Sequence, residues 1–165
     1  MRYFQPSEFA CKCGHCDGGE GRMSPSLLER LDAARDVAGL PFVVSSGYRC
    51  PAHNKAVGGV ADSAHTRGYA ADIRCTDSHT RFAVLRAVLD AGFRRVELAP
   101  TWIHVDCDPA KPRDVASVSS GSKLRDCVKY PPIGTLTDLT EDDLAGDNEL
   151  IPVRCRNVPS TALLL

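Results

Sequence analysis

The stretch from Ser63 to Ile73 constrains the fold of this chain more than any other part of it. Its second half alternates small and apolar residues, which predicts a β-strand with Asp72 on one face and apolar neighbours on the other. His65 precedes this strand, and Gly68 makes a tight turn between the two sterically easy. A histidine in such a turn can fold back over the strand. We therefore expect His65 and Asp72 to meet at one point.

A second histidine lies in a predicted β-hairpin. The runs Arg94–Leu98 and Trp102–Cys107 read as two strands, and the short segment Ala99–Thr101 joins them tightly. Side chains alternate between the two faces of a strand, so His104 and Asp106 share one face of the second run. His104 is therefore a candidate partner for the histidine and aspartate of the first stretch.

Two histidines and one carboxylate form a common ligand set for catalytic zinc, which takes three protein ligands and leaves one position for water. Such zinc activates water at neutral pH and supports hydrolysis of an amide or an ester. We therefore predict that His65, Asp72 and His104 bind Zn²⁺. Each residue also has an ordinary interpretation: a loop histidine, a turn or capping aspartate, and a common His-Val-Asp sequence on a strand.

An arginine follows a short apolar run. Residues 42–44 predict a buried strand, and Arg49 comes soon after it, at a strand end where sheets often present functional groups. Arginine stays charged and can bind an oxyanion through two N–H groups. Arg49 is therefore a candidate catalytic residue, and the alternative is an ordinary surface arginine.

Two segments have the periodicity of amphipathic helices. Residues 24–38 begin with Ser24 as a cap and Pro25 in the first turn, and they end before Gly39. Residues 78–91 are expected to form a second helix with Ser78 as its cap, and a shorter helix is expected over residues 51–57. The stripe expected to be buried in the second helix consists of Phe82, Leu85, Val88 and Leu89.

The chain contains eight cysteines, and three of them lie close together at Cys11, Cys13 and Cys16. Their spacing resembles half of a zinc knuckle, which needs a fourth ligand from a distant part of the chain, for example Cys50. The alternative is a cysteine-rich loop that packs against the protein or forms disulfides. The N-terminus lacks the apolar core of a secretory signal, which favours reduced thiols or a metal site over disulfides.

Length and composition indicate one globular domain. The chain has 165 residues, of which 43% are hydrophobic and 25% charged. A net charge of -1 does not indicate a nucleic-acid partner, and no apolar run is long enough to cross a membrane. We expect a monomer that is made in a cytoplasm without a signal peptide; the alternative is that the chain is already the mature form. Residues 1–108 are the expected domain with its cysteine-rich arm, and residues 109–165 an irregular, partly acidic tail.

The motifs resemble those of a known enzyme family. The pattern Ser63-x-His65-x-x-Gly68-x-Ala70-x-Asp72 is similar to the zinc-ligand signature of the D-alanyl-D-alanine carboxypeptidase and dipeptidase family. Residues 46–49 look like the family's block with the transition-state arginine, and residues 103–106 like the block with the last ligand. The arm from Phe4 to Cys16 resembles the small, single-domain branch that phages and prophages often encode. The resemblance covers roughly residues 3–108.

The resemblance implies a fold, a cofactor and a substrate. It implies a small α/β (α+β) fold related to the hedgehog signalling domain, with an antiparallel sheet that carries the zinc site and two or three flanking helices. It implies Zn²⁺ held by His65, Asp72 and His104, with Arg49 stabilising the oxyanion. The implied substrate is a peptide of bacterial peptidoglycan, either a stem peptide or its D-Ala terminus.

One position departs from the family pattern. Many members carry Glu or Asp three residues before the last histidine as the general base, and here that residue is Thr101. A hydroxyl cannot replace a carboxylate in that role at pH 7. Glu97 is our candidate for the base, because it can reach in from the neighbouring strand of the hairpin. Asp106 is the second candidate, because it shares a face with His104.

Three functions remain open from the sequence. The first is a zinc peptidase that cuts cell-wall peptide bonds as a carboxypeptidase, dipeptidase or endopeptidase, for example a lysin released during phage lysis or a part of a virion. The second is a cell-wall-binding module that keeps zinc and has lost catalysis, which Thr101 favours. The third is a thiol-zinc interaction domain built on Cys11, Cys13 and Cys16.

Overall fold

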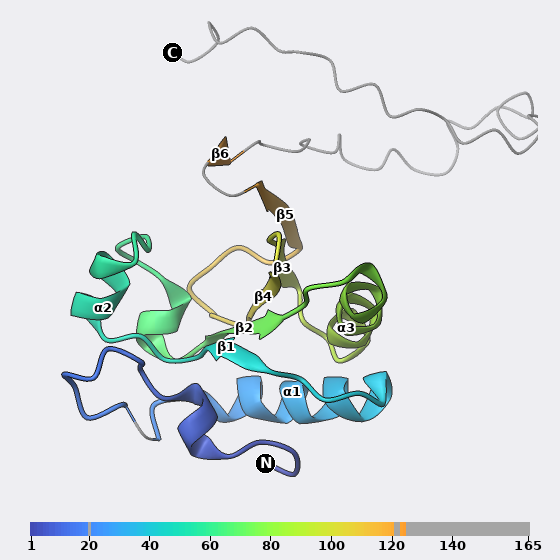
Figure 1. The fold of residues 1–165 in the computed structure, drawn as a ribbon, viewed down its shortest axis with the longest axis horizontal. Coiled ribbons are helices and arrows are strands. Elements are labelled where there is room, and N and C mark those ends of the chain that lie inside the picture. Colours follow the sequence, from blue (N-terminus) through green and yellow to red (C-terminus); the bar gives the residue numbers. More distant parts are fainter. Residues whose placement is uncertain (20, 121–122, 125–165) are drawn as a thin grey trace, which may run out of the picture. The chain divides into compact units, whose positions relative to one another are not determined.

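The computed structural model describes residues 1–19, 21–120 and 123–124. Within these residues six strands form one sheet in the order β1-β2-β4-β3-β5-β6 (Figure 1). The strands are β1 (Val44–Ser46), β2 (Ala70–Arg74), β3 (Arg95–Leu98), β4 (Trp102–Asp106), β5 (Val115–Ser120) and β6 (Lys123–Leu124). The predicted strand after Gly68 and the predicted hairpin thus form the centre of the sheet.

The sheet is mixed, which corrects the expected antiparallel sheet. The pairs β1–β2, β2–β4 and β3–β4 are antiparallel, whereas β5 runs parallel to β3. The α+β class with flanking helices is confirmed. The strand β5 lies beyond residue 108, so the sheet includes part of the segment expected to be irregular. The acidic cluster between Asp138 and Asp147 lies outside the described residues.

The strand β5 has little local signal because three of its residues are serines, which are weak strand formers. Its position depends on contacts that are distant in sequence. The Val115 N–H donates to the Arg94 carbonyl at 3.0 Å, and the Arg94 Nε–H donates to Asp114 Oδ1 at 2.6 Å. These bonds align β5 with the edge of β3, and no periodicity in residues 109–120 predicts them.

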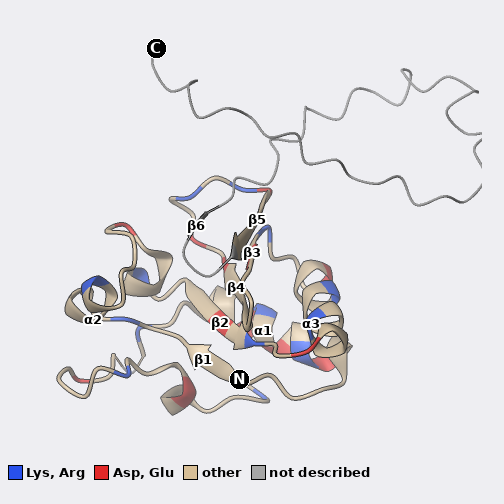
Figure 2. Ribbon diagram, turned by 45° about the horizontal axis from the view of Figure 1, so that its top comes forward, with Lys and Arg blue, Asp and Glu red and all other residues tan. Residues whose placement is uncertain are grey.

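In the described part of the chain, three α-helices and two short 3₁₀ helices accompany the sheet. They are α1 (Pro25–Ala38), α2 (Pro51–Ala56), α3 (Ser78–Asp90), η1 (Pro6–Phe9) and η2 (Ala64–Arg67). The first predicted helix is confirmed, with Pro25 in its first turn and Gly39 ending it in the left-handed conformation at φ 63°. In both ribbon views α2 and α3 lie on opposite sides of the strands (Figure 1, Figure 2).

The helix α3 differs from its prediction in its cap and in its buried face. Its cap is Asp77, whose carboxylate accepts the Thr80 N–H at 2.8 Å, and not Ser78. Val88 is buried as predicted and Leu85 packs against the core, but Phe82 is 69% exposed and Leu89 is 49% exposed, and Val84 and Ala87 are buried instead. The buried face is therefore rotated toward the small and β-branched residues, which pack close against α1.

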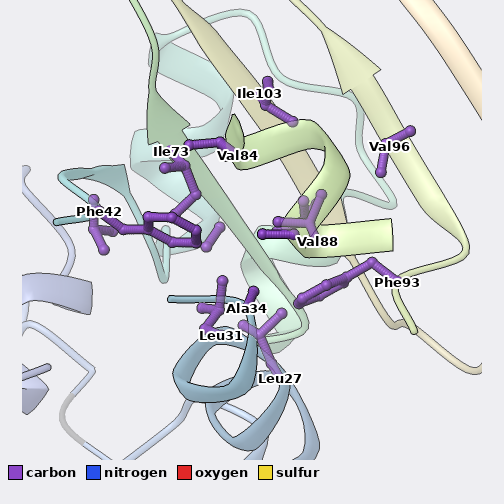
Figure 3. Close-up of a cluster of buried hydrophobic side chains, with 14 of the residues drawn as sticks. Leu27, Leu31, Ala34, Phe42, Ile73, Val84, Val88, Phe93, Val96 and Ile103 are labelled. Carbon is purple, nitrogen blue, oxygen red and sulfur yellow. The ribbon is translucent and has the colours of Figure 1, made fainter. Parts of the chain in front are cut away.

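The hydrophobic core lies between one face of the sheet and the helices α1 and α3. Side chains from α1, α3 and the central strands meet there (Figure 3). The labelled core residues are Leu27, Leu31, Ala34, Phe42, Ile73, Val84, Val88, Phe93, Val96 and Ile103. Because side chains alternate along a strand, the neighbours of Ile73 and Ile103 point to the opposite face. That face carries Asp72 and His104.

Charged residues of both signs are interspersed over the described elements (Figure 2). None of the helices in the described part of the chain is long and apolar enough to cross a membrane.

Candidate metal centre and active site

Three elements bring His65, Asp72 and His104 to one point. His65 lies in η2, Asp72 in β2 and His104 in β4, where it pairs directly with Asp72. The His65 Nε2 and His104 Nδ1 atoms are 3.2 Å apart, and they lie 3.3 Å and 2.8 Å from Asp72 Oδ1. These three residues form one of two groups of potential metal ligands among the described residues. The predicted cluster is therefore assembled in space.

The turn at Gly68 places His65 over the sheet. Gly68 ends η2 with φ +77°, a conformation that residues with a Cβ rarely adopt. A Cβ at this position would lie 1.9 Å from the Arg22 carbonyl oxygen. The Gly68 carbonyl accepts the Ser24 N–H at 2.8 Å, which ties the turn to the start of α1. Glycine is thus required both by the backbone conformation and by the close packing.

Each histidine is oriented by a bond at its other ring nitrogen. His65 Nδ1 lies 2.7 Å from the Gly47 carbonyl, which can only accept a proton, so Nδ1 carries the hydrogen. His104 Nε2 lies 3.4 Å from the Asp106 carboxylate, which likewise favours a hydrogen on Nε2. In their neutral forms, as in a metal complex, the two rings therefore present lone pairs toward Asp72 from His65 Nε2 and His104 Nδ1. Partners of this kind are typical of metal-binding histidines.

The cluster attracts positive charge. Burial raises the pKa of the Asp72 carboxyl, but the bonds to His104 and His65 outweigh it and hold the pKa well below its usual value. Burial lowers the pKa of His104, but Asp106 and Asp72 outweigh it and raise the pKa to about 9. Without a metal His104 is therefore protonated at neutral pH, and a metal cation that binds between the three residues would replace that proton.

The donor set fits zinc. Imidazole nitrogen and carboxylate oxygen bind Zn²⁺ at about 2.0–2.2 Å, which places the ligand atoms of a tetrahedral site about 3.3 Å apart. The separations of 2.8, 3.2 and 3.3 Å among the three donor atoms are close to this value. Three protein ligands also leave the fourth position free for water or substrate. The residues present therefore fit a catalytic zinc ion.

Arg49 lies beside this cluster. Its backbone N–H donates to the His65 carbonyl at 3.2 Å, and its side chain lines the same cavity as His65 and Asp72. The guanidinium Nε is buried and has no hydrogen-bond partner among the described residues. Burial lowers the pKa of Arg49, and the Asp72 carboxylate partly offsets this effect. A guanidinium that lines a cavity is suited to bind an anionic group there.

Glu97 and Asp106 occupy different places around His104. Glu97 of β3 pairs directly with His104 of β4 and lines the cavity. Asp106 is 3% exposed and is held by the Arg95 Nε–H at 3.0 Å, in addition to its contact with His104. Asp106 is therefore engaged with His104 and Arg95, and both carboxylates line the cavity. Thr101 lies in the exposed turn before β4.

The cavity around the cluster has a volume of about 440 Å³. It is lined by the three clustered residues and by Arg49, Glu97 and Trp102, among others. Trp102 is 38% exposed and follows Thr101 at the start of β4. A cavity of this size is in the range of ligand-binding pockets. Its opening gives a substrate access to the side chains that could perform the chemistry.

Two contributions were not predicted from the sequence. The Gly47 carbonyl and the Arg95 guanidinium complete the hydrogen bonds around the histidines. Arg95 could have been found, because it lies two residues before Glu97 and therefore shares its face of the strand. The Gly47 carbonyl could not have been found, because a backbone carbonyl carries no sequence signal.

The structure also brings Cys11, Cys13, Cys16 and Cys50 together as a second group of potential metal ligands.

A comparison with protein families agrees with these motifs. A family model described as Peptidase M15 matches residues 2–106. Among solved structures, the L-Ala D-Glu endopeptidase ChiX of Serratia marcescens is similar, with 22% sequence identity, a TM-score of 0.40, and coverage of 53% of this chain and 81% of that chain. No curated protein matches the chain. Because the family model spans more than half of the sequence, the chain belongs to the peptidase M15 family of zinc-dependent metallopeptidases.

Proposed function

We propose that this protein hydrolyses peptide bonds in the stem peptides of bacterial peptidoglycan, as a D-Ala-D-Ala carboxypeptidase or as an endopeptidase. The observation that carries the proposal is the convergence of the His65, Asp72 and His104 donor atoms in a cavity that Arg49 and Glu97 also line. Membership of the M15 family supports a peptide substrate from peptidoglycan.

His65, Asp72 and His104 would hold the zinc ion, which supplies a Lewis acid and activates water when bound. The Gly47 carbonyl and Asp106 fix the two imidazole rings so that their lone pairs stay directed at the ion. Arg49 binds the oxygen of the scissile carbonyl as negative charge develops on it. Donors preorganised for such charge typically contribute about 10²–10³-fold in rate.

Glu97 acts as the general base in this mechanism. It accepts a proton from the attacking water and returns it to the departing amine, so that the proton count is unchanged over the cycle. Its register opposite His104 supports this role, because side chains of directly paired residues project from the same face about 5 Å apart.

The site of action in this proposal is the cell wall. A protein made in the cytoplasm would reach it when a phage lyses the cell or as a part of a virion. This setting is supported by the similarity of the arm from Phe4 to Cys16 to the single-domain branch that phages often encode.

The alternative function is a zinc-containing module that binds the cell wall without cutting it. The observation that favours it is Thr101, which stands where many family members have their catalytic carboxylate. The two functions differ in what happens to the wall polymer. A peptidase releases new amino groups, whereas a binding module sediments with the polymer and leaves it intact.

The experiment compares wild type with Glu97→Gln on purified peptidoglycan. We expect wild type to release new amino groups, with or without free D-alanine, and Glu97→Gln to keep its zinc and lose at least about 10²-fold in rate, because glutamine cannot accept the proton. Mass spectrometry of the products identifies the bond. Full activity of Glu97→Gln would eliminate this base, and co-sedimentation of wild type without amine release would favour the binding module.

A further inference from the structure

Four cysteines form a second cluster away from the cavity described above. Cys11, Cys13 and Cys16 come from the N-terminal arm, and Cys50 precedes α2. Their sulfur atoms all lie within 4.8 Å of one another, with 3.4 Å between Cys13 and Cys16 and 3.9 Å between Cys13 and Cys50. Four sulfurs bound to tetrahedral zinc at about 2.3 Å lie about 3.8 Å apart. A disulfide would require about 2.0 Å.

The backbone of the arm is shaped to present these thiols. Gly14 has φ +70°, which turns the chain between Cys13 and Cys16. The Cys11 N–H donates to the Gly18 carbonyl at 2.8 Å and closes the loop. The Tyr48 N–H donates to the Phe9 carbonyl at 2.8 Å and so holds the arm against the segment that leads to Cys50.

The sulfur atoms accept hydrogen bonds from the surrounding groups. The His15 N–H donates to Cys13 Sγ at 3.3 Å, the Cys50 N–H to Cys11 Sγ at 3.3 Å, and the His53 N–H to Cys50 Sγ at 3.4 Å. His53 Nδ1 also lies 3.2 Å from Cys11 Sγ. Donors directed at sulfur stabilise thiolates, and such outer hydrogen bonds accompany metal-bound cysteines.

We propose that Cys11, Cys13, Cys16 and Cys50 bind a second zinc ion with a structural role. Thiolate ligands in a tetrahedral arrangement select zinc over oxygen-preferring cations such as Mg²⁺. Four protein ligands leave no position for water, so this site is closed and performs no hydrolysis. It is independent of the proposed function, because none of its ligands belongs to the cavity with His65.

The second zinc ion would fasten the arm to the segment that carries Arg49. Cys50 follows Arg49 directly, and the Arg49 N–H is bonded to the His65 carbonyl. A Cβ at Gly47 would lie 2.6 Å from the Phe9 backbone, which shows how closely the arm and this segment approach. The arm is already held by the buried Phe9 and by its bond to the Tyr48 N–H, and a metal crosslink would add a further restraint at the cysteines.

The first test measures bound metal in a His65→Ala background, so that the cavity site contributes nothing. We expect one zinc per chain to remain, and X-ray absorption to show a shell of four sulfurs at about 2.3 Å. The additional substitution Cys16→Ser removes the metal, whereas Cys107→Ser, which changes a half-buried cysteine outside the cluster, keeps it. Absence of zinc in His65→Ala, or a shell of nitrogen and oxygen, would overturn the proposal.

Wild-type protein alone also decides between zinc and disulfides. We expect two zinc ions per chain and, after denaturation with a chelator and no reductant, all eight cysteines as free thiols. The proposal would be overturned by a result of one zinc per chain together with fewer than eight free thiols, the number falling by two for each disulfide. This measurement needs no variant, so a folding defect in a cysteine variant does not affect it.

Hydrogen exchange tests the proposed role in positioning. In Cys16→Ser we expect faster exchange of amides in residues 9–18 and 47–53, with exchange in α3 unchanged, because the crosslink joins only the first two segments. Cys16 is exposed, so its loss leaves the core intact. Unchanged exchange in both segments would contradict the structural role.

Discussion

The residues around the candidate metal centre divide into those that would bind the ion and those that orient the ligands. His65 offers Nε2 and His104 offers Nδ1, and this choice follows from what the other ring nitrogens contact. Asp106 makes two contacts of this kind: its carboxylate contacts His104 Nε2 and accepts a hydrogen bond from the Arg95 Nε–H. It is a positioning residue and does not touch the reacting atoms in the proposed mechanism.

The substitution Asp106→Asn tests this distinction. An amide in place of the carboxylate weakens the bond to the His104 imidazole and leaves Arg95 without its ion pair, so we expect zinc affinity to fall by about 10–100-fold. Competition with a chelating dye measures the affinity. Glu97→Gln is the matched control and should bind zinc as wild type does. Equal zinc affinity of Asp106→Asn and wild type would show that His104 needs no carboxylate partner.

The turn that ends η2 is the element on which the position of His65 depends. Gly68 combines a left-handed backbone with the contact to the Arg22 carbonyl, whereas Gly92 has φ +83° and open space around it. Substitutions at the two glycines therefore separate the free-energy cost of the backbone conformation from the cost of packing.

Alanine substitutions at these glycines make the comparison measurable. We expect Gly92→Ala to lower the free energy of unfolding by about 1–2 kcal/mol, from the left-handed conformation alone. We expect Gly68→Ala to lower it by about 2–5 kcal/mol, because overpacking against Arg22 adds to that cost, and to weaken zinc binding through His65. Denaturant titration measures both variants. Equal losses would mean that the backbone at Gly68 moves away from Arg22 freely.

At the scale of the whole molecule, β5 extends the fold beyond residue 108. It covers the edge of β3, the strand that carries Glu97, and pairs Ser117 with that residue. An uncovered edge strand exposes unpaired backbone groups and promotes aggregation. The expected boundary at residue 108 would therefore remove a part of the sheet that borders the cavity.

Two truncated chains test this boundary. A chain ending at residue 108 should unfold at a lower temperature and aggregate more than a chain ending at residue 124, because only the second keeps β5 and β6. Thermal unfolding and light scattering compare them directly. If both chains unfold at the same temperature, β5 contributes nothing to the stability of the sheet.

Particular residues show what the sequence could and could not predict. The cluster of His65, Asp72 and His104 could be predicted because strand alternation and a glycine turn are local patterns, and because the residues resemble the zinc-ligand signature of a known family. The buried face of α3 could not be predicted in full. The large apolar side chain of Phe82 favoured its own burial, whereas packing against α1 buries Val84 and Ala87. The parallel pairing of β5 was not accessible either, because it depends on contacts with Arg94 that no local pattern encodes.

The most direct test of a zinc-dependent peptidase measures amino groups released from purified peptidoglycan by wild type and by His65→Ala, with zinc supplied to both. His65 is 1% exposed, so circular dichroism must first show that the variant is folded. We predict release by wild type, its loss after chelation, its return with zinc, and no release by folded His65→Ala. Release by the folded variant at the wild-type rate would contradict a zinc peptidase built on His65, Asp72 and His104.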